Sequence, residues 1–159
     1  MKKLNLTQFI IQLHFQIHDR VRSVLHEHAA DELSYVSAAS AGDVSYAIDV
    51  CAEKIIDDYF TKNILDGGAV VICEGLGIKT YPAELSSKKA RYRIIIDPLD
   101  GTREIMYDKR SCWILTGIAI DRGNETNLQD IFLAVQTEIP PTLQSLSSVL
   151  VAEKGKGAK

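Results

Sequence analysis

The period of the hydrophobic pattern changes at Gly67-Gly68, and this change limits the folds that are open to the chain. Before these glycines, apolar residues recur at steps of three and four, as they do in helices that bury one face. After them, short and nearly continuous apolar runs alternate with turn residues, as they do in strands. Two helices followed by a run of strands predict an α+β fold, with both helices packed on one face of a mostly antiparallel sheet.

The two predicted helices span residues from about 6 to 28 and from about 45 to 65. The apolar stripe of the first helix consists of Leu6, Phe9, Ile10, Leu13, Ile17, Val21, Val24, Leu25 and His28. The stripe of the second consists of Ile48, Ala52, Ile55, Ile56, Tyr59 and Phe60. The two glycines stop the second helix. The small residues of the segment 37–43, between the helices, predict a loop.

Five strands are predicted after the glycines, each bounded by turn residues. They cover residues 69–73, 93–96, 113–120, 131–137 and 149–152. Asp121-Arg122-Gly123-Asn124 predicts the turn between the third and fourth strands, and Pro140-Pro141 ends the fourth. The glycine-rich tail after residue 153 predicts a last turn.

Composition and charge exclude several classes of protein. The chain has 159 residues, of which 46% are hydrophobic and 25% charged, as in globular proteins. A single domain of this length buries roughly 70% of the surface that its unfolded chain exposes, so a real core is expected. The formal net charge of −3 argues against a nucleic-acid partner, because nucleic-acid-binding proteins usually have a basic surface.

The sequence also predicts a cytoplasmic protein with no membrane partner. No apolar run approaches the roughly 18 residues that a membrane helix requires. Met1-Lys2-Lys3 could begin a signal peptide, but polar residues interrupt the apolar region that follows. The cysteines are odd in number and far apart, as expected for reduced and buried residues. His14 and His18 lie four residues apart but lack a third ligand nearby, so we expect ordinary side chains beside the apolar stripe.

The segment 94–102, with the sequence IIIDPLDGT, carries the clearest chemical signal. A predicted buried strand leads to Asp97 and Asp100, and two carboxylates this close raise each other's pKa unless a cation lies between them. Hard carboxylate oxygens on a rigid turn suit Mg²⁺. The N–H groups at the start of the short helix expected after Gly101 suit a phosphate oxygen. Adjacent metal and phosphate sites are what metal-assisted phosphoryl chemistry requires.

An ordinary Asp-Pro turn, with Asp100 as a helix N-cap, is the alternative interpretation of this segment. Two further acids favour the metal site. Glu74 ends the preceding predicted strand and would lie beside Asp97 if the two strands are neighbours, and Asp49 lies near the start of the second helix. Haloacid-dehalogenase-type phosphatases have a nucleophilic aspartate where this chain has Pro98, so attack by a water molecule is the better hypothesis.

The acidic segment resembles the signature of the inositol monophosphatase/fructose-1,6-bisphosphatase superfamily, with the sequence Asp97-Pro98-Leu99-Asp100-Gly101-Thr102. Glu74 resembles the acid that ends the preceding strand in this family. The segment 43–49 resembles its upstream acidic segment, and Lys154-Gly155-Lys156-Gly157-Ala158 resembles the glycine-rich turn near the end of its first half. The order and approximate spacing of these segments agree along the whole chain.

This resemblance implies a Mg²⁺ cofactor with four ligands from the chain. One Mg²⁺ would be held by Glu74, Asp97 and the backbone carbonyl of Leu99. A second would be held by Asp97 and Asp100. Metal ions held in this way make a water molecule more acidic and neutralise the charge of the phosphate.

The resemblance also implies how the substrate is bound and attacked. Gly101 and Thr102 would present backbone N–H groups to the phosphate of a small phosphorylated substrate. Thr102 and Asp49 would orient and deprotonate the attacking water. Members of the family commonly dimerise, so a homodimer is implied as well.

Three departures from the family pattern affect the prediction. Gly75 stands where a second acid is often found, and Arg103-Glu104-Ile105 is nearer to the nucleotide-bisphosphate branch than to inositol phosphatases. Family members also continue into a second αβ half, which supplies a further metal-binding aspartate in a Trp-Asp motif that this chain lacks. We therefore expect residues 1–159 to form a single N-terminal αβ half of an αβαβα sandwich, with the C-terminal half absent.

Two functions remain open at this stage. The first is a Mg²⁺-dependent phosphomonoesterase that hydrolyses a small sugar, polyol or nucleotide phosphate through a metal-activated water. The second is a truncated and catalytically silent module that binds Mg²⁺ or dimerises, because a sheet edge left unpaired favours association.

Overall fold

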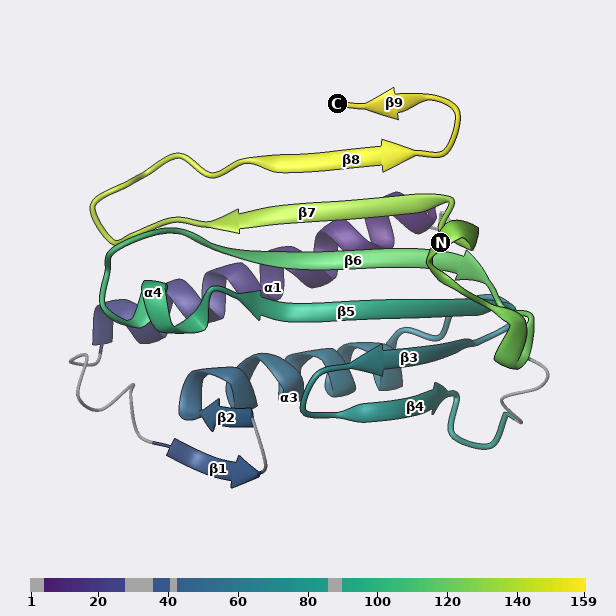
Figure 1. Ribbon diagram of the computed structural model, residues 1–159, viewed down its shortest axis with the longest axis horizontal. Coiled ribbons are helices and arrows are strands. Elements are labelled where there is room, and N and C mark those ends of the chain that lie inside the picture. The colour runs from purple at the N-terminus through teal and green to yellow at the C-terminus, as the bar shows by residue number, and fades with distance from the viewer. Residues whose placement is uncertain (1–4, 28–35, 41–42, 86–89) are drawn as a thin grey trace.

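The computed structural model describes residues 5–27, 36–40, 43–85 and 90–159, and it has an α+β fold (Figure 1). The helices are α1 (Leu6–Glu27), α3 (Ala47–Lys62), the short α4 (Thr102–Met106) and the 3₁₀ turns η2 (Gly123–Glu125) and η3 (Leu128–Asp130). The strands are β1 (Val36–Ser40), β2 (Asp43–Tyr46), β3 (Ala69–Cys73), β4 (Gly77–Tyr81), β5 (Tyr92–Asp100), β6 (Cys112–Ile120), β7 (Leu133–Ile139), β8 (Val149–Glu153) and β9 (Gly157–Ala158). Both long helices and all five predicted strands are present.

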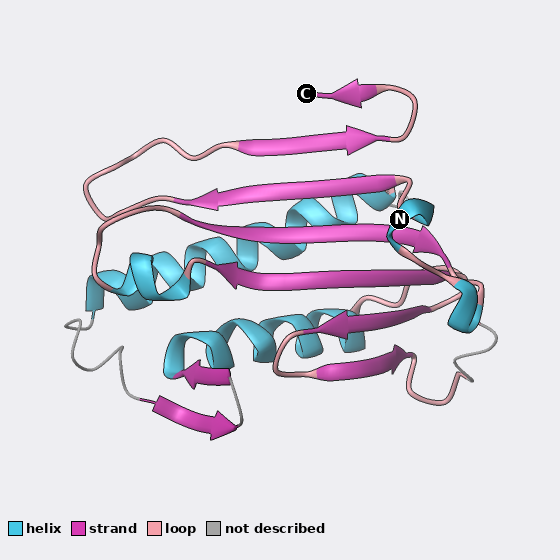
Figure 2. Cartoon of the chain, viewed as in Figure 1, coloured by secondary structure: helices cyan, strands magenta, loops and turns pink. Residues whose placement is uncertain are grey.

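Seven of the strands form one mixed sheet in the order β4-β3-β5-β6-β7-β8-β9. Neighbouring strands are antiparallel except β3 and β5, which run parallel. Figure 2 shows α1 and α3 together behind this sheet, so the molecule has two layers. The arrangement is the one predicted: both helices lie on one face of a mostly antiparallel sheet.

The core fills the space between the helices and the sheet. In α1, Ile10, Leu13 and Ile17 are fully buried, as the helical stripe predicts. Buried side chains of the sheet meet them at every second position of β5 and β6: Ile94, Ile96, Ile114 and Ile118. Each fully buried aliphatic side chain contributes roughly 1.5–3 kcal/mol relative to an exposed one, so this shared core holds the two layers together.

His14 is a polar residue inside this core. Its side chain is fully buried, whereas the sequence predicted a position beside the apolar stripe. Nδ1 lies 2.9 Å from Oγ1 of Thr137 on β7, and Nε2 lies 2.8 Å from Oγ1 of Thr116 on β6. Burial lowers the pKa of His14 to about 3, because the charged imidazolium would lose its hydration. The neutral ring therefore links α1 to two strands.

Two parts of the fold differ from the sequence prediction. The segment 37–43 was expected to be a loop, but its described residues belong to β1 and β2, which pair antiparallel. Strands β4 and β9 were not predicted. β4 follows a tight turn that contains Gly75, with a φ of 77°, and it begins at Gly77, with a φ of 69°, before pairing with β3. Pairing of neighbouring segments therefore overrode weak local signals.

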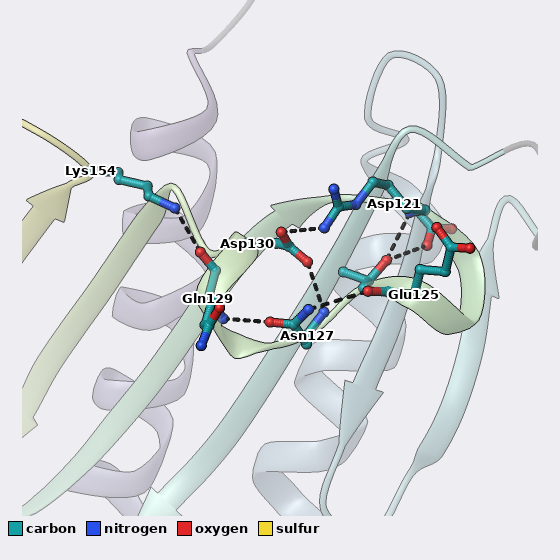
Figure 3. A network of polar contacts seen from close by, with 8 residues as sticks. Asp121, Glu125, Asn127, Gln129, Asp130 and Lys154 are labelled. Atoms are coloured by element: carbon teal, nitrogen blue, oxygen red, sulfur yellow. Dashed lines mark hydrogen bonds and ion pairs between the residues drawn. The ribbon is translucent and has the colours of Figure 1, made fainter.

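The connection between β6 and β7 is held by polar contacts at one end of the sheet (Figure 3). Asp121 accepts hydrogen bonds from Nε of Arg93 at 2.8 Å and from the Gly123 N–H at 2.9 Å. Asn127 and Asp130 form a reciprocal capping box around η3. The Arg93 side chain is 20% exposed and that of Asp121 is 2% exposed, so the two residues form a largely buried ion pair.

The cysteines are free, as expected, with Cys73 and Cys112 buried and Cys51 partly buried. In the part of the chain that the structure describes, no helix is long and apolar enough to cross a membrane.

Candidate functional site

The predicted acids of two strands come together because β3 and β5 are parallel neighbours. The register pairs Cys73 with Ile96, so Glu74, the first residue after β3, and Asp97, which lies within β5, are at the same edge of the sheet. Burial, followed by the carboxylates of Glu53, Asp97 and Glu74, raises the pKa of the Cys73 thiol to about 12. These carboxylates are therefore close enough to act on one buried group.

A backbone irregularity brings Asp100 to this edge as well. The pairing of β5 with β6 shifts between Asp97 and Asp100, and Asp100 pairs again with Trp113. Within the irregular segment, the Leu99 N–H donates to Oδ1 of Asp97 at 3.1 Å. The Leu99 side chain is buried and anchors the turn in the core. Both aspartates thus lie on a turn that is fixed by its own backbone.

The turn continues into α4, as predicted. Gly101 precedes this helix with a φ of 97°, a left-handed conformation that favours glycine. The structure places Gly101, rather than Asp100, at the N-cap position, and no side chain of the described residues caps the helix. The first N–H groups of a helix lack intrahelical partners, so the backbone at Gly101 and Thr102 suits an anion.

Thr102 connects this turn to the second long helix. Its Oγ1 lies 2.8 Å from Oδ1 of Asp49 on α3 and 2.7 Å from the carbonyl oxygen of Leu99. A hydroxyl has one proton, so it donates to one of these acceptors at a time and keeps lone pairs for a further donor. The pair that the resemblance implied, Asp49 and Thr102, is therefore in direct contact.

Electrostatic repulsion is a property of the whole group of acids. Burial raises the pKa of Asp97, and the carboxylates of Asp100 and Asp49 raise it further, although the Leu99 N–H acts in the opposite direction. Burial also raises the pKa of Glu53, followed by the effects of Asp49 and Glu74. A cation placed among these groups would lower the pKa of both Asp97 and Glu53.

Glu53 is a member of this group that the sequence prediction did not include among the site residues. It follows Asp49 by four residues on α3, a spacing that places both on one helical face. A side chain at Gly75 would collide with it, because a Cβ there would lie 1.8 Å from Oε1 of Glu53. The carboxylate of Glu53 thus occupies the space beside the turn where the resemblance expects a second acid.

The chemistry of these donors fits Mg²⁺, which binds to hard oxygen ligands. The predicted ligands supply only oxygen atoms: Glu74, Asp97, Asp100 and the carbonyl of Leu99. Among the described residues, however, no three His, Cys, Asp or Glu side chains already surround a single point. The acids are neighbours and repel one another, but their side chains do not yet converge.

A cavity of about 600 Å³ lies between α3 and β4, away from the acidic turn. It is lined by Asp57, Thr61, Ile64, Lys79, Thr80, Tyr81, Pro82, Ala83, Glu84 and Leu85. None of the predicted site residues lines it. Lys109, one of the basic residues that follow the turn, has its ammonium group 5.3 Å from the centre of the Tyr107 ring.

Known structures share this fold. The chain is similar to fructose-1,6-bisphosphatase of Leishmania major, with 20% identity and a TM-score of 0.70 over 96% of this chain and 48% of that one. It is similar to the MJ0109 gene product, an inositol monophosphatase-fructose 1,6 bisphosphatase, with 19% identity and a TM-score of 0.68 over 98% of this chain and 52% of that one. A third similar structure is the suhB protein of Bartonella henselae, with 21% identity and a TM-score of 0.65 over 97% and 51% of the two chains.

No family model and no curated protein matches the sequence. The solved structures show that the chain has the fold of about half of a protein of the inositol monophosphatase/fructose-1,6-bisphosphatase type, as the resemblance implied. It spans about half the length of the solved structures that it matches.

Proposed function

We propose that the chain is the αβ half of a Mg²⁺-dependent phosphomonoesterase that acts on a small sugar, polyol or nucleotide phosphate. The observation that carries this proposal is the contact of Thr102 with Asp49 beside the acidic turn of β5. The names of the similar structures support it, since they are a fructose-1,6-bisphosphatase and an inositol monophosphatase.

Two sets of oxygen ligands would hold Mg²⁺ in this proposal. One comprises Glu74, Asp97 and the Leu99 carbonyl, and the other comprises Asp97 and Asp100. When bound, Mg²⁺ neutralises phosphate charge and makes a water molecule more acidic. The repulsion among the acids supports the assignment, because a cation is the group that removes it.

The remaining residues would handle the substrate and the proton. The backbone N–H groups of Gly101 and Thr102 would bind phosphate oxygens at the start of α4. Thr102, whose hydroxyl donates to Asp49, would accept a hydrogen bond from the attacking water and orient it. As the water oxygen bonds to phosphorus, its proton would move to the Thr102–Asp49 pair, and the bond to the leaving alkoxide would break.

A second candidate function is a silent module that binds Mg²⁺ or dimerises. The specific observation in its favour is the repulsion among the acids, which a bound cation would relieve without any turnover. In this case the acids would bind Mg²⁺ without hydrolysing a phosphate.

Phosphate release and Mg²⁺ binding, measured side by side, test both functions. We expect Mg²⁺-dependent release from a panel of inositol, fructose and nucleotide phosphates, and a loss of about 100-fold or more in Asp97→Asn. Asp58→Asn, an exposed acid that pairs with Lys62, is the matched control and should behave as wild type. Calorimetric Mg²⁺ binding without turnover supports the silent module. Unchanged activity in Asp97→Asn, or no binding at all, would overturn the metal site.

A further inference from the structure

Glu53, on α3, differs from the acids that follow it on the same helix. Oδ1 of Asp57 lies 3.0 Å from Nζ of Lys79. Oδ2 of Asp58 lies 3.9 Å from Nζ of Lys62. Glu53, in contrast, forms no ion pair with any residue that the structure describes. Its side chain is partly buried, so water screens its charge only in part, and a bound cation would stabilise its ionised form.

The carboxylate of Glu53 lies against the turn that joins β3 to β4. A Cβ at Gly75 would lie 1.8 Å from Oε1 of Glu53 and 2.8 Å from Oε2, so the carboxylate occupies the space of a side chain at this position. Gly75 directly follows Glu74, which comes at the end of β3. The side chain of Glu53 thus reaches from the helical layer to the edge of the sheet at which the predicted ligands lie.

The charge of Glu53 lies between acids of both layers. Burial raises its pKa, and the carboxylates of Asp49 on α3 and of Glu74 on the sheet raise it further. Among the carboxylates that raise the pKa of the buried Cys73 thiol, Glu53 has a larger effect than Asp97 or Glu74. Glu53 is therefore a member of the group of acids by its position in space.

An acid at this position can act on Mg²⁺ without touching the ion. Mg²⁺ in proteins usually keeps several water molecules and binds directly to only one or two carboxylates. Groups around such a site form hydrogen bonds to its water and to its direct ligands, and so fix them in place. No three His, Cys, Asp or Glu side chains of the described chain surround a single point. A contact through water therefore suits Glu53 better than a direct one.

We propose that Glu53 is an outer ligand of the Mg²⁺ site, whose carboxylate accepts hydrogen bonds from the water that the ion keeps. This inference rests on the Mg²⁺ site proposed above and adds to it a residue from α3. Glu74 and Asp97 supply negative charge from the sheet, whereas Glu53 supplies it from the helical layer. Gly75 is part of the same arrangement, because a side chain there would displace the carboxylate.

Calorimetric titration of the purified chain with MgCl₂ tests the role of Glu53. Glu53→Gln keeps the size of the side chain but removes its charge, and it should raise the dissociation constant about tenfold or more, as the loss of an outer ligand does. Asp58→Asn, on the same helix, is the matched control and should bind as wild type does. Unchanged affinity in Glu53→Gln overturns this inference alone, whereas a wild type that binds no Mg²⁺ overturns the proposed site as well.

Thermal unfolding without Mg²⁺ separates this role from a structural one. Glu53→Gln removes a charge that repels Asp49 and Glu74, so the variant should be at least as stable as wild type. A lower Tm in the variant would show that Glu53 serves to hold α3 against the turn, and this result overturns the inference.

A double-mutant cycle tests the position of the carboxylate. Gly75→Ala places a methyl group in the space of the carboxylate, so it should raise the dissociation constant about tenfold in a chain that has Glu53. In the Glu53→Ala background the same substitution should have little further effect. Strain of the turn, where Gly75 has a φ of 77°, is present in both backgrounds and cancels in the cycle. Equal effects in the two backgrounds overturn the inference, because the carboxylate then does not act from its place over Gly75.

Discussion

At the scale of single residues, Asp97 shows how a residue proposed to bind Mg²⁺ can reduce the stability of its own fold. Burial and the carboxylates of Asp100 and Asp49 raise its pKa, whereas the Leu99 N–H lowers it and favours the ionised form. The turn nevertheless holds the carboxylate at the sheet edge, because the Leu99 side chain is buried in the core. A fold that holds carboxylates together despite their mutual repulsion is typical of a site that binds a cation.

Gly68, at the point where the hydrophobic period changes, provides a test of backbone fit. Its φ is 69°, and a Cβ there would lie 2.2 Å from Cδ2 of Leu85 and 2.8 Å from the carbonyl oxygen of Tyr81. We expect Gly68→Ala to lower the free energy of unfolding by about 3 kcal/mol, because backbone strain and collision add together. Urea denaturation measures this change.

Gly123→Ala is the control for that substitution. Gly123 has a similar φ of 62°, but a Cβ there would meet no atom of the described residues within 4 Å, apart from its own chain neighbours. Only the backbone strain applies at this position, so the expected loss is about 1 kcal/mol. Equal losses at the two glycines would show that the contacts with Leu85 and Tyr81 do not restrict the first one.

At the scale of elements, the sequence predicted the helices and strands that have a hydrophobic pattern of their own. The stripe of α1 and the buried runs of β3, β5 and β6 were recognisable, because each follows the period of its own structure. β4 was missed because only its pairing with β3 defines it. The acids of the β5 turn were predictable in the same local way. Glu53 was not assigned, since its closeness to Glu74 depends on how α3 packs against the sheet.

His14, which links α1 to the sheet, predicts that the protein loses stability in acid. The pKa of His14 is about 3 in the folded state, whereas the ordinary value for a histidine is 6.5. The unfolded chain therefore binds an extra proton between these values, so stability is complete above about pH 6.5 and is lost as the pH falls below it. At pH 4.5 the loss from this residue is about 2–3 kcal/mol.

Urea midpoints between pH 7.5 and 4.5 measure this loss, and two variants isolate its source. His14→Gln keeps a side chain that can bond to the two threonines but does not titrate, so its stability should fall less over this range. His26→Gln, on an exposed position of the same helix, is the control and should keep the wild-type profile. If His14→Gln and wild type lose the same stability, the buried imidazole is not the acid-sensitive group.

At the scale of the whole molecule, the group of acids at the edge of the sheet joins parts of the chain that are distant in sequence. Asp49 comes from α3, Glu74 from the end of β3, and Asp97 and Asp100 from β5. The helix α3 and the sheet must be packed together before these carboxylates become neighbours. A cation that binds to them therefore binds only to the folded chain, and it should stabilise the whole fold.

Thermal unfolding with and without Mg²⁺ tests this linkage. At ten times its dissociation constant, Mg²⁺ should add about 1.4 kcal/mol, which raises the Tm of a protein of this size by about 3–6 °C. Asp97→Asn should be more stable than wild type without Mg²⁺, because one repelling charge is gone, and it should gain little from the ion. Asp58→Asn should respond as wild type does, and KCl at equal ionic strength controls for general screening. An equal Mg²⁺ response in Asp97→Asn would place the ion elsewhere on the molecule.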